Sequence, residues 1–286
     1  MDLYSNYIVE PEYVHERLTT KNFRVIDCTV YFELKKVGAS TIYSGHADYL
    51  NRHIPGAAYL HMVDDLSDQN NKIPFSIINQ ETLNRTLSDI GIHKDDEIIL
   101  YGSGFHMAIT RAWWVLKISG LNNIKIMNGG WDAWLERKFP VSSGEETFTK
   151  SSFNGQRDDS VILDKEQVKA ATKNDDFLLV NALTRKQFSG GGTHYGRPGR
   201  IPESINIPAL EILDHNTGKF SPKEKMKQQL KSILESKKSI ISYCGGGIAA
   251  TTVYFALKIF GKEDIFLYDN SLLEWSNDQN LPMELD

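Results

Sequence analysis

The sequence predicts an α/β protein made of two tandem domains, each with a mostly parallel sheet flanked by helices. Short, continuous apolar runs alternate with amphipathic stretches along the chain, which is typical of buried parallel strands separated by helices. The two halves also resemble each other, segment by segment and in the same order. Between them lies a stretch rich in serine, glycine and charged residues, with few apolar anchors, which indicates a linker.

The same series of strands and helices is expected in each half. The apolar runs predict strands at residues 23–28, 97–102, 124–129, 177–182, 239–244 and 265–270. The helix-like stretches predict helices at residues 81–91, 108–120, 224–236 and 249–261. In an open α/β sheet, ligands bind beyond the carboxyl ends of the strands, and Cys244 stands at such an end.

An internal duplication explains this recurrence. Residues 110–134 align with residues 251–275 without a gap, so that Trp134 meets Trp275. Three further blocks match in the same order, namely 97–104 with 239–246, 53–60 with 200–207, and 24–28 with 178–182. Two tandem copies of one fold account for this pattern better than a short solenoid repeat does. We therefore predict a first domain at residues 1–143, a linker at 144–158 and a second domain at 159–286.

Composition and charge argue against several classes of function. The net charge of -5 gives no broad basic surface for nucleic acid or an anionic membrane. The two cysteines, Cys28 and Cys244, are too few for a disulfide framework, and no Cys/His cluster has the spacing of zinc ligands, so we expect no metal and no other cofactor. No signal peptide or membrane-spanning run is expected, and the predicted location is cytoplasmic.

The segment SYCGGGIAATT, residues 242–252, places Cys244 and three glycines between a predicted strand and a predicted helix. A thiolate there would meet unpaired backbone N–H groups and the positive end of the helix dipole, and both favour the anion. Gly245, Gly246 and Gly247 can adopt conformations closed to other residues and bring their N–H groups close to the sulfur. The alternatives are a tight strand-to-helix turn and a cysteine that acts as a small hydrophobic residue.

Two observations favour a reactive Cys244. The duplication places Gly102 in the first domain where the second has Cys244, which is the pattern of an active domain beside an inactive copy. Cysteine phosphatases also hold a thiolate between a strand and a helix, but they carry an arginine six residues later to bind phosphate, and that position is Ala250. The phosphatase hypothesis is therefore disfavoured.

Several longer segments carry a resemblance to a known family. The first domain contains IDCTVYF, HADYLNRHIPGAAYLHMVDDLSD, ITRAWWVLKISG and MNGGWDAWLERKFPV, and the second contains GRPGRIPESINIP, YCGGGIAAT and LYDNSLLEWSNDQNLPM. In this order they resemble the two-domain rhodanese family of thiosulfate and 3-mercaptopyruvate sulfurtransferases. The resemblance implies two tandem rhodanese-like domains, the first of them inactive. It also implies that Cys244 takes a sulfane sulfur from a small donor, becomes a persulfide and passes the sulfur to a thiol or cyanide.

The resemblance further implies substrate-binding residues, with some departures from the family pattern. Loops that favour thiosulfate carry basic residues after the cysteine, and loops that favour 3-mercaptopyruvate carry a serine two residues and a threonine five residues after it. Here the corresponding positions hold Gly245, Gly246 and Ala249. Leu183 replaces a family arginine, whereas Arg197 matches a second one and is expected to bind the donor's anionic group. The further candidates for substrate binding are Gly247, Ile248, Arg185 and His53, with Arg200 as another replacement for the missing arginine.

Structural alternatives stay open for these side chains and for the chain as a whole. Arg185, Arg197 and Arg200 can be solvated loop residues, and His53 can support its turn rather than transfer protons. Cys28 lies in an apolar strand and is interpreted as a core residue. The alternatives to an enzyme are a non-catalytic rhodanese-like module that binds a partner or senses redox state, and a persulfide carrier for a protein acceptor.

Overall fold

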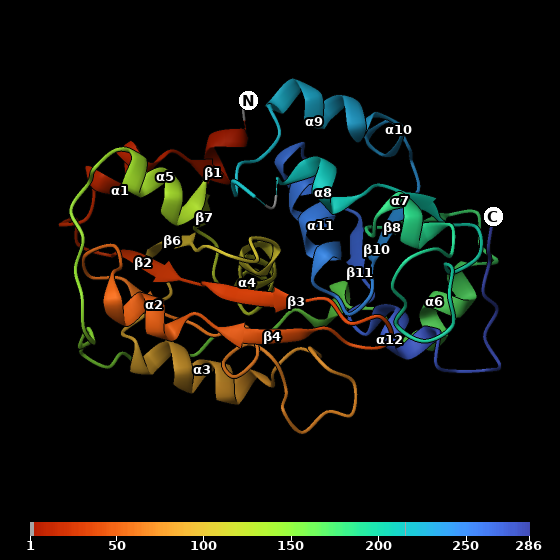
Figure 1. Cartoon of the computed structure of the whole chain (residues 1–286), viewed down its shortest axis with the longest axis horizontal. Helices are drawn as coiled ribbons and strands as arrows, with labels where there is room; N and C mark the ends of the chain where they lie inside the picture. Colours follow the sequence, from red (N-terminus) through yellow and green to blue (C-terminus); the bar gives the residue numbers. More distant parts are fainter. Residues whose placement is uncertain (1–2, 215) are drawn as a thin grey trace.

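Two α/β domains make up the molecule, as the sequence predicts (Figure 1). This computed structural model describes residues 3–214 and 216–286. The first sheet contains β1 (Ile8–Val9), β2 (Phe23–Asp27), β5 (Ala58–Tyr59), β6 (Glu97–Tyr101) and β7 (Ile124–Met127), in the order β1-β7-β6-β2-β5. The second contains β8 (Phe177–Asn181), β9 (Ile205–Asn206), β10 (Ser239–Tyr243) and β11 (Ile265–Leu267), in the order β11-β10-β8-β9. All pairs within these two sheets are parallel.

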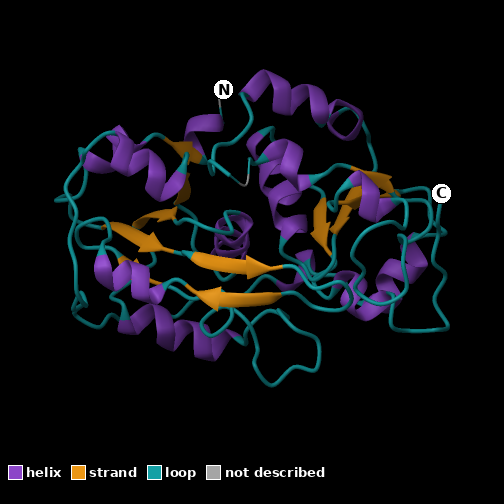
Figure 2. Cartoon of the chain, in the orientation of Figure 1, coloured by secondary structure: helices purple, strands orange, loops and turns teal. Residues whose placement is uncertain are grey.

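Helices flank both sheets (Figure 2). In the first domain they are α1 (Pro11–His15), α2 (His46–Asn51), α3 (Gln80–Asp89), α4 (Met107–Ile118) and α5 (Gly130–Glu136). In the second they are α6 (Lys165–Ala171), α7 (Arg185–Phe188), α8 (Ala209–Ile212), α9 (Lys223–Gln229), α10 (Lys231–Leu234), α11 (Ala249–Ile259) and α12 (Ser271–Trp275). Short 3₁₀ turns occupy Tyr4–Asn6 and Asp159–Val161. The helix predicted at 224–236 is divided at Leu230 into α9 and α10.

The duplication extends to individual buried hydrogen bonds. In the first domain the backbone N–H of Ile54 donates to the hydroxyl of Tyr101 at 3.1 Å, and in the second the N–H of Ile201 donates to Tyr243 at the same distance. The aligned tryptophans behave in the same way, since the indole nitrogens of Trp134 and Trp275 each donate to a proline carbonyl at 2.9 Å. The two domains therefore share their internal support as well as their strand order.

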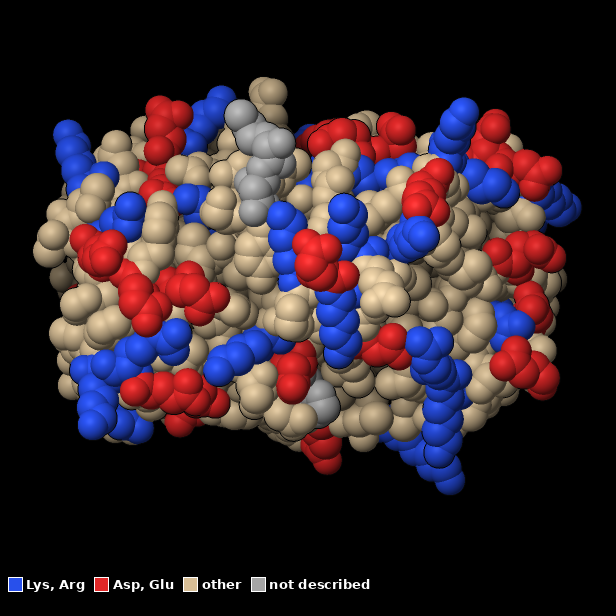
Figure 3. Space-filling view, turned by 90° about the horizontal axis from the view of Figure 1, so that it is seen from above, with Lys and Arg blue, Asp and Glu red and all other residues tan. Residues whose placement is uncertain are grey.

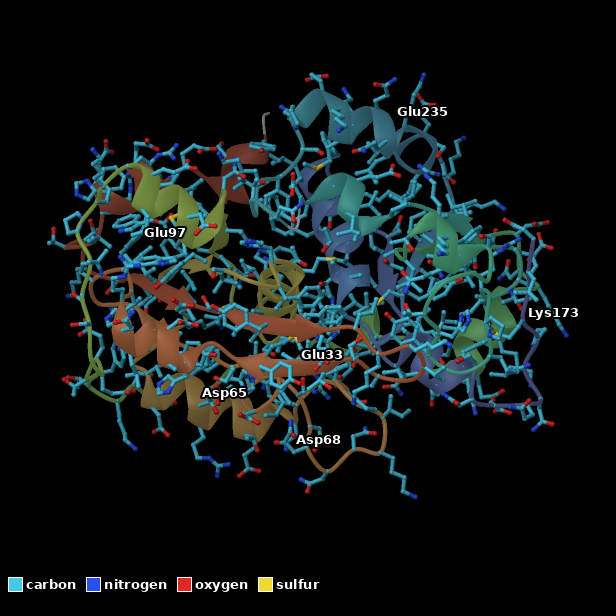
Figure 4. The ribbon with its side chains drawn as sticks, in the orientation of Figure 1. Glu33, Asp65, Asp68, Glu97, Lys173 and Glu235 are labelled. Atoms are coloured by element: carbon cyan, nitrogen blue, oxygen red, sulfur yellow. The ribbon has the colours of Figure 1, made fainter. Side chains whose placement is uncertain are left out.

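One element of the first domain, a β-hairpin, was not predicted from the sequence. β3 (Val30–Glu33) and β4 (Thr41–Ser44) form an antiparallel hairpin that runs from the first domain toward the second (Figure 1). Glu33, at the end of β3, marks the part of the hairpin nearest the second domain (Figure 4). Beyond it the chain bonds to the second domain, because the N–H of Gly38 donates to the carbonyl of His194 at 2.8 Å.

The interface between the domains is built mainly on α4 and α11, which pack against each other. At its centre the hydroxyl of Thr110 lies 3.0 Å from that of Thr251 and 2.9 Å from that of Thr252, and all three side chains are fully buried. Thr110 and Thr251 are equivalent in the sequence alignment. The two copies of one helix thus meet where their equivalent residues face each other.

The segment predicted as a linker, residues 144–158, contains no helix or strand in the structure. It is nevertheless held against the first domain. Phe153 is buried in the core, Ser151 bonds to Ser88, and Arg157 donates to the carbonyl of Ile78 at 2.7 Å. The segment is thus held by one buried aromatic side chain, Phe153, and by hydrogen bonds, although it contains few apolar residues. The boundaries of the linker stay a prediction.

On the face seen in Figure 3, acidic and basic side chains are interspersed and neither sign dominates. Within residues 3–214 and 216–286, no helix is long and apolar enough to cross a membrane. In the same part of the chain, no group of histidine, cysteine and carboxylate side chains is arranged to hold a metal ion.

Candidate active site

Cys244 directly follows β10, the strand at the centre of the second sheet, and precedes α11. Its side chain is buried, with 2% of the residue exposed. The N–H of Cys244 donates to the hydroxyl of Ser271 at 3.0 Å, and its carbonyl accepts from the N–H of Leu272 at 3.2 Å. The carbonyl of Gly245 accepts from Leu273 at 2.8 Å. The start of α12 therefore fixes the loop that carries the thiol.

Each of the three glycines lets a different group approach the loop. A Cβ at Gly245 would collide with the ring of Tyr195, so this aromatic ring lies directly on the backbone. A Cβ at Gly246 would lie 2.8 Å from a methyl of Leu273 and 3.1 Å from the ring of Phe75. Gly247 has a φ of +77°, a conformation that favours glycine, and packs against Asp269. The loop thus needs glycine for close packing as well as for its backbone conformation.

Cys244 opens onto a cavity of about 160 Å³ between the two domains. The residues that line it come from both, namely Phe32, Leu34, Ser40, Phe75, Phe105 and Met107 from the first and Ala182, Leu183, Thr184, Gln187, Tyr195, Ala209, Leu210, Cys244, Gly246, Ile248 and Ala249 from the second. None of these is charged, and none is a histidine. The polar side chains in the lining, apart from the thiol, are those of Ser40, Thr184, Gln187 and Tyr195. The thiol of Cys244 therefore faces a mostly apolar space.

Tyr195 is the polar side chain placed most directly over the loop. Burial raises the pKa of its phenol well above the usual value, and the negative charge of a Cys244 thiolate acts in the same direction. Gln187 interacts with its hydroxyl and also donates to the hydroxyl of Thr193 at 2.8 Å. Tyr195 is therefore protonated at neutral pH, and its ring lies against the loop that carries Cys244.

The arginines expected to bind an anion do not reach this cavity. Arg197 donates to the carbonyls of Ser276, Asp278 and Leu281 at 2.6 to 3.0 Å, so its guanidinium holds the C-terminal segment in place. Arg200 forms ion pairs with carboxylates of that segment and lies over the ring of Phe188. The structure does not bring either arginine together with Cys244.

Arg185 and His53 also lie outside the cavity lining. The side chain of Arg185 is 69% exposed, and its guanidinium donates bidentate hydrogen bonds of 3.0 and 2.9 Å to the carboxylate of Glu211. His53 is fully buried in the first domain, where its Nδ1 contacts the carbonyl of Tyr49 at 2.8 Å and its Nε2 contacts Glu146 at 3.2 Å. Of the predicted side chains, the structure brings together Cys244, Gly246, Ile248 and Ala249 in the lining, with Gly245 and Gly247 in the same loop.

Sequence reasoning missed a buried ion pair that supports the loop from the other domain. The guanidinium of Arg111, on α4, donates to Asp269 at 2.5 Å, to the carbonyl of Gly247 at 3.3 Å and to that of Phe75 at 2.7 Å. Asp269 in turn accepts from the N–H of Ile77 at 2.9 Å. The available signal was the charge of Arg111 among the apolar residues of ITRAWWVLKI, whose other charged residue, Lys117, lies in the last turn of the helix. Arg111 ties the first domain to the turn that follows Cys244.

Cys28, the other cysteine, is in the core of the first domain. Burial raises the pKa of its thiol well above the usual value, and the nearby carboxylates of Asp27 and Asp65 raise it further. It is therefore a protonated core side chain, in agreement with the interpretation from the sequence.

Comparisons with known proteins agree with this architecture. The family model for the rhodanese-like domain matches residues 10–137 and again residues 164–278. The chain is 27% identical over 278 residues to the 3-mercaptopyruvate sulfurtransferase of Mus musculus, covering 94% of this chain and 91% of the relative. It is 26% identical over 246 residues to the 3-mercaptopyruvate sulfurtransferase of Escherichia coli K12, covering 83% and 85%.

Solved structures show the same fold over the whole chain. The crystal structure of SseA from Escherichia coli, described as a 3-mercaptopyruvate sulfotransferase, superposes with a TM-score of 0.77 at 23% identity, covering 93% of this chain and 98% of that one. The Tum1 protein from Saccharomyces cerevisiae superposes with a TM-score of 0.79 at 20% identity and full coverage of both chains. The named relatives support sulfurtransferase activity, which requires a sulfur donor and an acceptor. The chain belongs to the rhodanese-like family and contains two domains of that family.

Proposed function

We propose that the protein transfers a sulfane sulfur from a small donor to an acceptor through a persulfide on Cys244. The observation that carries the proposal is the position of this cysteine, at the end of β10, before α11 and open to an interdomain cavity. The N-terminal end of α11 favours a negative charge on the sulfur. Cys28 lies outside that cavity lining and is held as a thiol, so it does not compete for the role.

The reaction divides into two displacements at sulfur. In the first, the Cys244 thiolate attacks the donor's outer sulfur. The electron pair of the broken bond leaves as sulfite from thiosulfate, or as an enolate from 3-mercaptopyruvate that takes up a proton to become pyruvate. In the second, the acceptor attacks the outer sulfur of the persulfide, and the electron pair returns to Sγ. We assign to Tyr195, whose ring lies against Gly245, a hydrogen bond donated to the anionic sulfur in both steps.

Among the two donors, we propose 3-mercaptopyruvate over thiosulfate. Thiosulfate carries two negative charges and 3-mercaptopyruvate carries one, and the cavity lining supplies no cation to either. The cost of burying an unpaired charge therefore disfavours thiosulfate more strongly. The mouse and E. coli relatives are named for 3-mercaptopyruvate.

Steady-state assays with both donors and cyanide as acceptor test this function. We expect repeated turnover, with kcat/KM for 3-mercaptopyruvate at least about tenfold above that for thiosulfate. Cys244→Ser should abolish turnover, and Cys28→Ser should retain most of it. A preference for thiosulfate would contradict the donor assignment alone, whereas an active Cys244→Ser variant would contradict the whole proposal.

The same assay separates the enzyme from the other functions considered for the chain. A non-catalytic module that binds a partner or senses redox state gives at most one sulfur per chain and no turnover. A carrier for a protein acceptor loads with sulfur but discharges slowly to cyanide. We propose the enzyme because the cavity beside the thiol has room for a small molecule. A cytoplasmic location stays part of this proposal.

A further inference from the structure

A second hollow continues the cysteine cavity outward. It has a volume of about 460 Å³ and is lined by Tyr31, Phe32, Leu34, Gly104, Phe105, Met107 and Leu210. Five of these residues also line the inner cavity, namely Phe32, Leu34, Phe105, Met107 and Leu210. The two spaces therefore form one passage that leads from the surface beside β3 to Cys244. We call the outer part of this passage, the space of about 460 Å³, the hairpin groove.

The walls of the hairpin groove are apolar and partly exposed to solvent. The rings of Phe32 and Phe105 stack with their centroids 4.4 Å apart and their planes 16° apart. Leu34 is 50% exposed, and Tyr31 and Leu210 also belong to the exposed large hydrophobic residues. A contiguous apolar patch on a surface marks a binding site more often than an accident of folding. Here the patch is continuous with the space around the candidate nucleophile.

Among residues 3–214 and 216–286, those that line the two parts of this passage are all uncharged. The arginines of the neighbouring loops are engaged elsewhere, Arg185 with Glu211, and Arg197 and Arg200 with the C-terminal segment. An ionic substrate body in the hairpin groove would lose hydration without gaining a partner. An uncharged aromatic or aliphatic body would instead be stabilised by burial against Phe32 and Leu34.

The size of the passage indicates which substrate occupies its outer part. A three-carbon donor reaches Cys244 with its sulfur and needs only the inner cavity of about 160 Å³. The hairpin groove is left for a larger molecule that enters after the donor product has gone. We propose that this molecule is the sulfur acceptor, an uncharged thiol with an aromatic or aliphatic body. The proposal rests on the proposed function of Cys244.

The transfer balances without any further reactant. The acceptor thiolate attacks the outer sulfur of the Cys244 persulfide, a new S–S bond forms on the acceptor, and the bond between Sγ and the outer sulfur breaks. The electron pair of that bond returns to Sγ as a thiolate. The acceptor leaves as a hydropersulfide, and its original proton ends on one of the two sulfur products.

Single-turnover kinetics on the preformed persulfide test the proposal. The probes are benzyl mercaptan, 2-mercaptoethanol, 3-mercaptopropionate and cysteamine, each rate being divided by the rate of the same thiol with a small disulfide in solution. We expect benzyl mercaptan to exceed each of the other three by at least about tenfold, because its ring is buried in the hairpin groove. Equal normalised rates for the four thiols, or a preference for a charged one, would overturn the proposal.

A pair of variants on the hairpin locates the effect. Leu34→Lys places a cation in the groove and should lower the ratio of benzyl mercaptan to 3-mercaptopropionate rates by at least about tenfold. Val37→Lys adds the same charge on the same hairpin, at a residue that is 61% exposed and outside both linings, and should leave that ratio unchanged. Equal ratios in the two variants would contradict the proposal.

The outcomes for the two proposals are distinguishable. If no persulfide forms on Cys244 with either donor, the proposed function fails. If the persulfide forms and is discharged by all four thiols without selectivity, the proposed function stands and the assignment of the hairpin groove fails.

Discussion

The loops after the two central strands, Gly102–His106 in the first domain and Cys244–Ile248 in the second, occupy equivalent places but face different surroundings. In the first domain, a Cβ at Gly102 would lie 3.1 Å from backbone atoms of both Cys28 and Thr29. The chain that continues from β2 covers this loop, since the N–H of Phe105 donates to the carbonyl of Val30 at 2.7 Å. In the second domain the corresponding continuation turns into α7 and leaves Cys244 beside a cavity.

The difference indicates that the route of the chain after one strand decides whether the equivalent loop is covered or faces a cavity. In the first domain, residues after β2 close the loop and then extend as the β3–β4 hairpin. Phe32 and Leu34 of that hairpin line the interdomain cavity onto which Cys244 opens. The first domain therefore contributes to the site by forming part of its enclosure, although its own loop carries no thiol.

The strongest test of this comparison moves the thiol into the first domain. Gly102→Cys in a Cys244→Ser background should remain inactive, at least about 1000-fold below the wild type. The new thiol would lie against the backbone of Cys28 and Thr29, and Gly102 does not belong to the lining of the interdomain cavity. Sulfur-transfer assays and alkylation of the native and unfolded variant measure this. Recovery of activity would mean that the loop alone makes the site.

Removing the buried ion pair between Arg111 and Asp269, which joins the two domains, should have the next largest effect, in this case on stability. Arg111→Met leaves the carboxylate of Asp269 buried without its partner, which should lower the free energy of unfolding by about 3–5 kcal/mol. Arg185→Met, which breaks an exposed pair with Glu211, should cost less than about 1 kcal/mol. Urea unfolding of both variants measures the difference. Similar costs would show that the buried pair gives no special support to the loop.

Tyr195 contacts the loop of the second domain at Gly245. We expect its hydroxyl to contribute to the rate of sulfur transfer rather than to the stability of the fold. Tyr195→Phe keeps the ring on Gly245 but removes the donor, so kcat/KM should fall by about tenfold with little change in stability. Because the pKa of the phenol is raised, it stays protonated, and the loss should be constant between roughly pH 6 and 9. A pH profile of both proteins checks this. A loss that disappears toward the alkaline end would contradict the role as a donor.

The smallest effect on activity is expected at Arg185, an exposed residue next to Thr184 of the cavity lining. Arg185→Ala should leave kcat/KM for the donor within a factor of about two, because its guanidinium is paired with Glu211 and lies outside the cavity lining. Steady-state kinetics with 3-mercaptopyruvate measure it. A tenfold loss would mean that Arg185 turns into the cavity when the donor binds.

The sequence was sufficient to predict what depends on local pattern. The apolar runs predicted the long strands, the duplication predicted two domains of one fold, and the glycine-rich segment after a strand drew attention to Cys244, which opens onto the interdomain cavity. The β3–β4 hairpin was missed because its residues mix charge, glycine and exposed apolar side chains without clean alternation. The direction of a long side chain also could not be predicted from the sequence. Arg197 is two residues from Tyr195 of the cavity lining, but its guanidinium donates to carbonyls of the C-terminal segment.

The walls of the cavity could not be predicted for a related reason. They are assembled from segments of both domains, and nothing in a single segment indicates which residue it will meet. Phe75 and Tyr195, which touch neighbouring glycines of one loop, are 120 positions apart in the chain. Arg111 is the exception, because a charge surrounded by apolar residues in the middle of a helix indicates a buried partner.

The central claim is that the open loop of the second domain, and not the closed loop of the first, carries the sulfur. Intact-mass spectrometry after incubation with 3-mercaptopyruvate and removal of excess donor tests it most directly. We predict one added sulfur atom on the wild type and on Cys28→Ser, released by cyanide, and none on Cys244→Ser. Sulfur retained on Cys244→Ser and lost from Cys28→Ser would contradict the account.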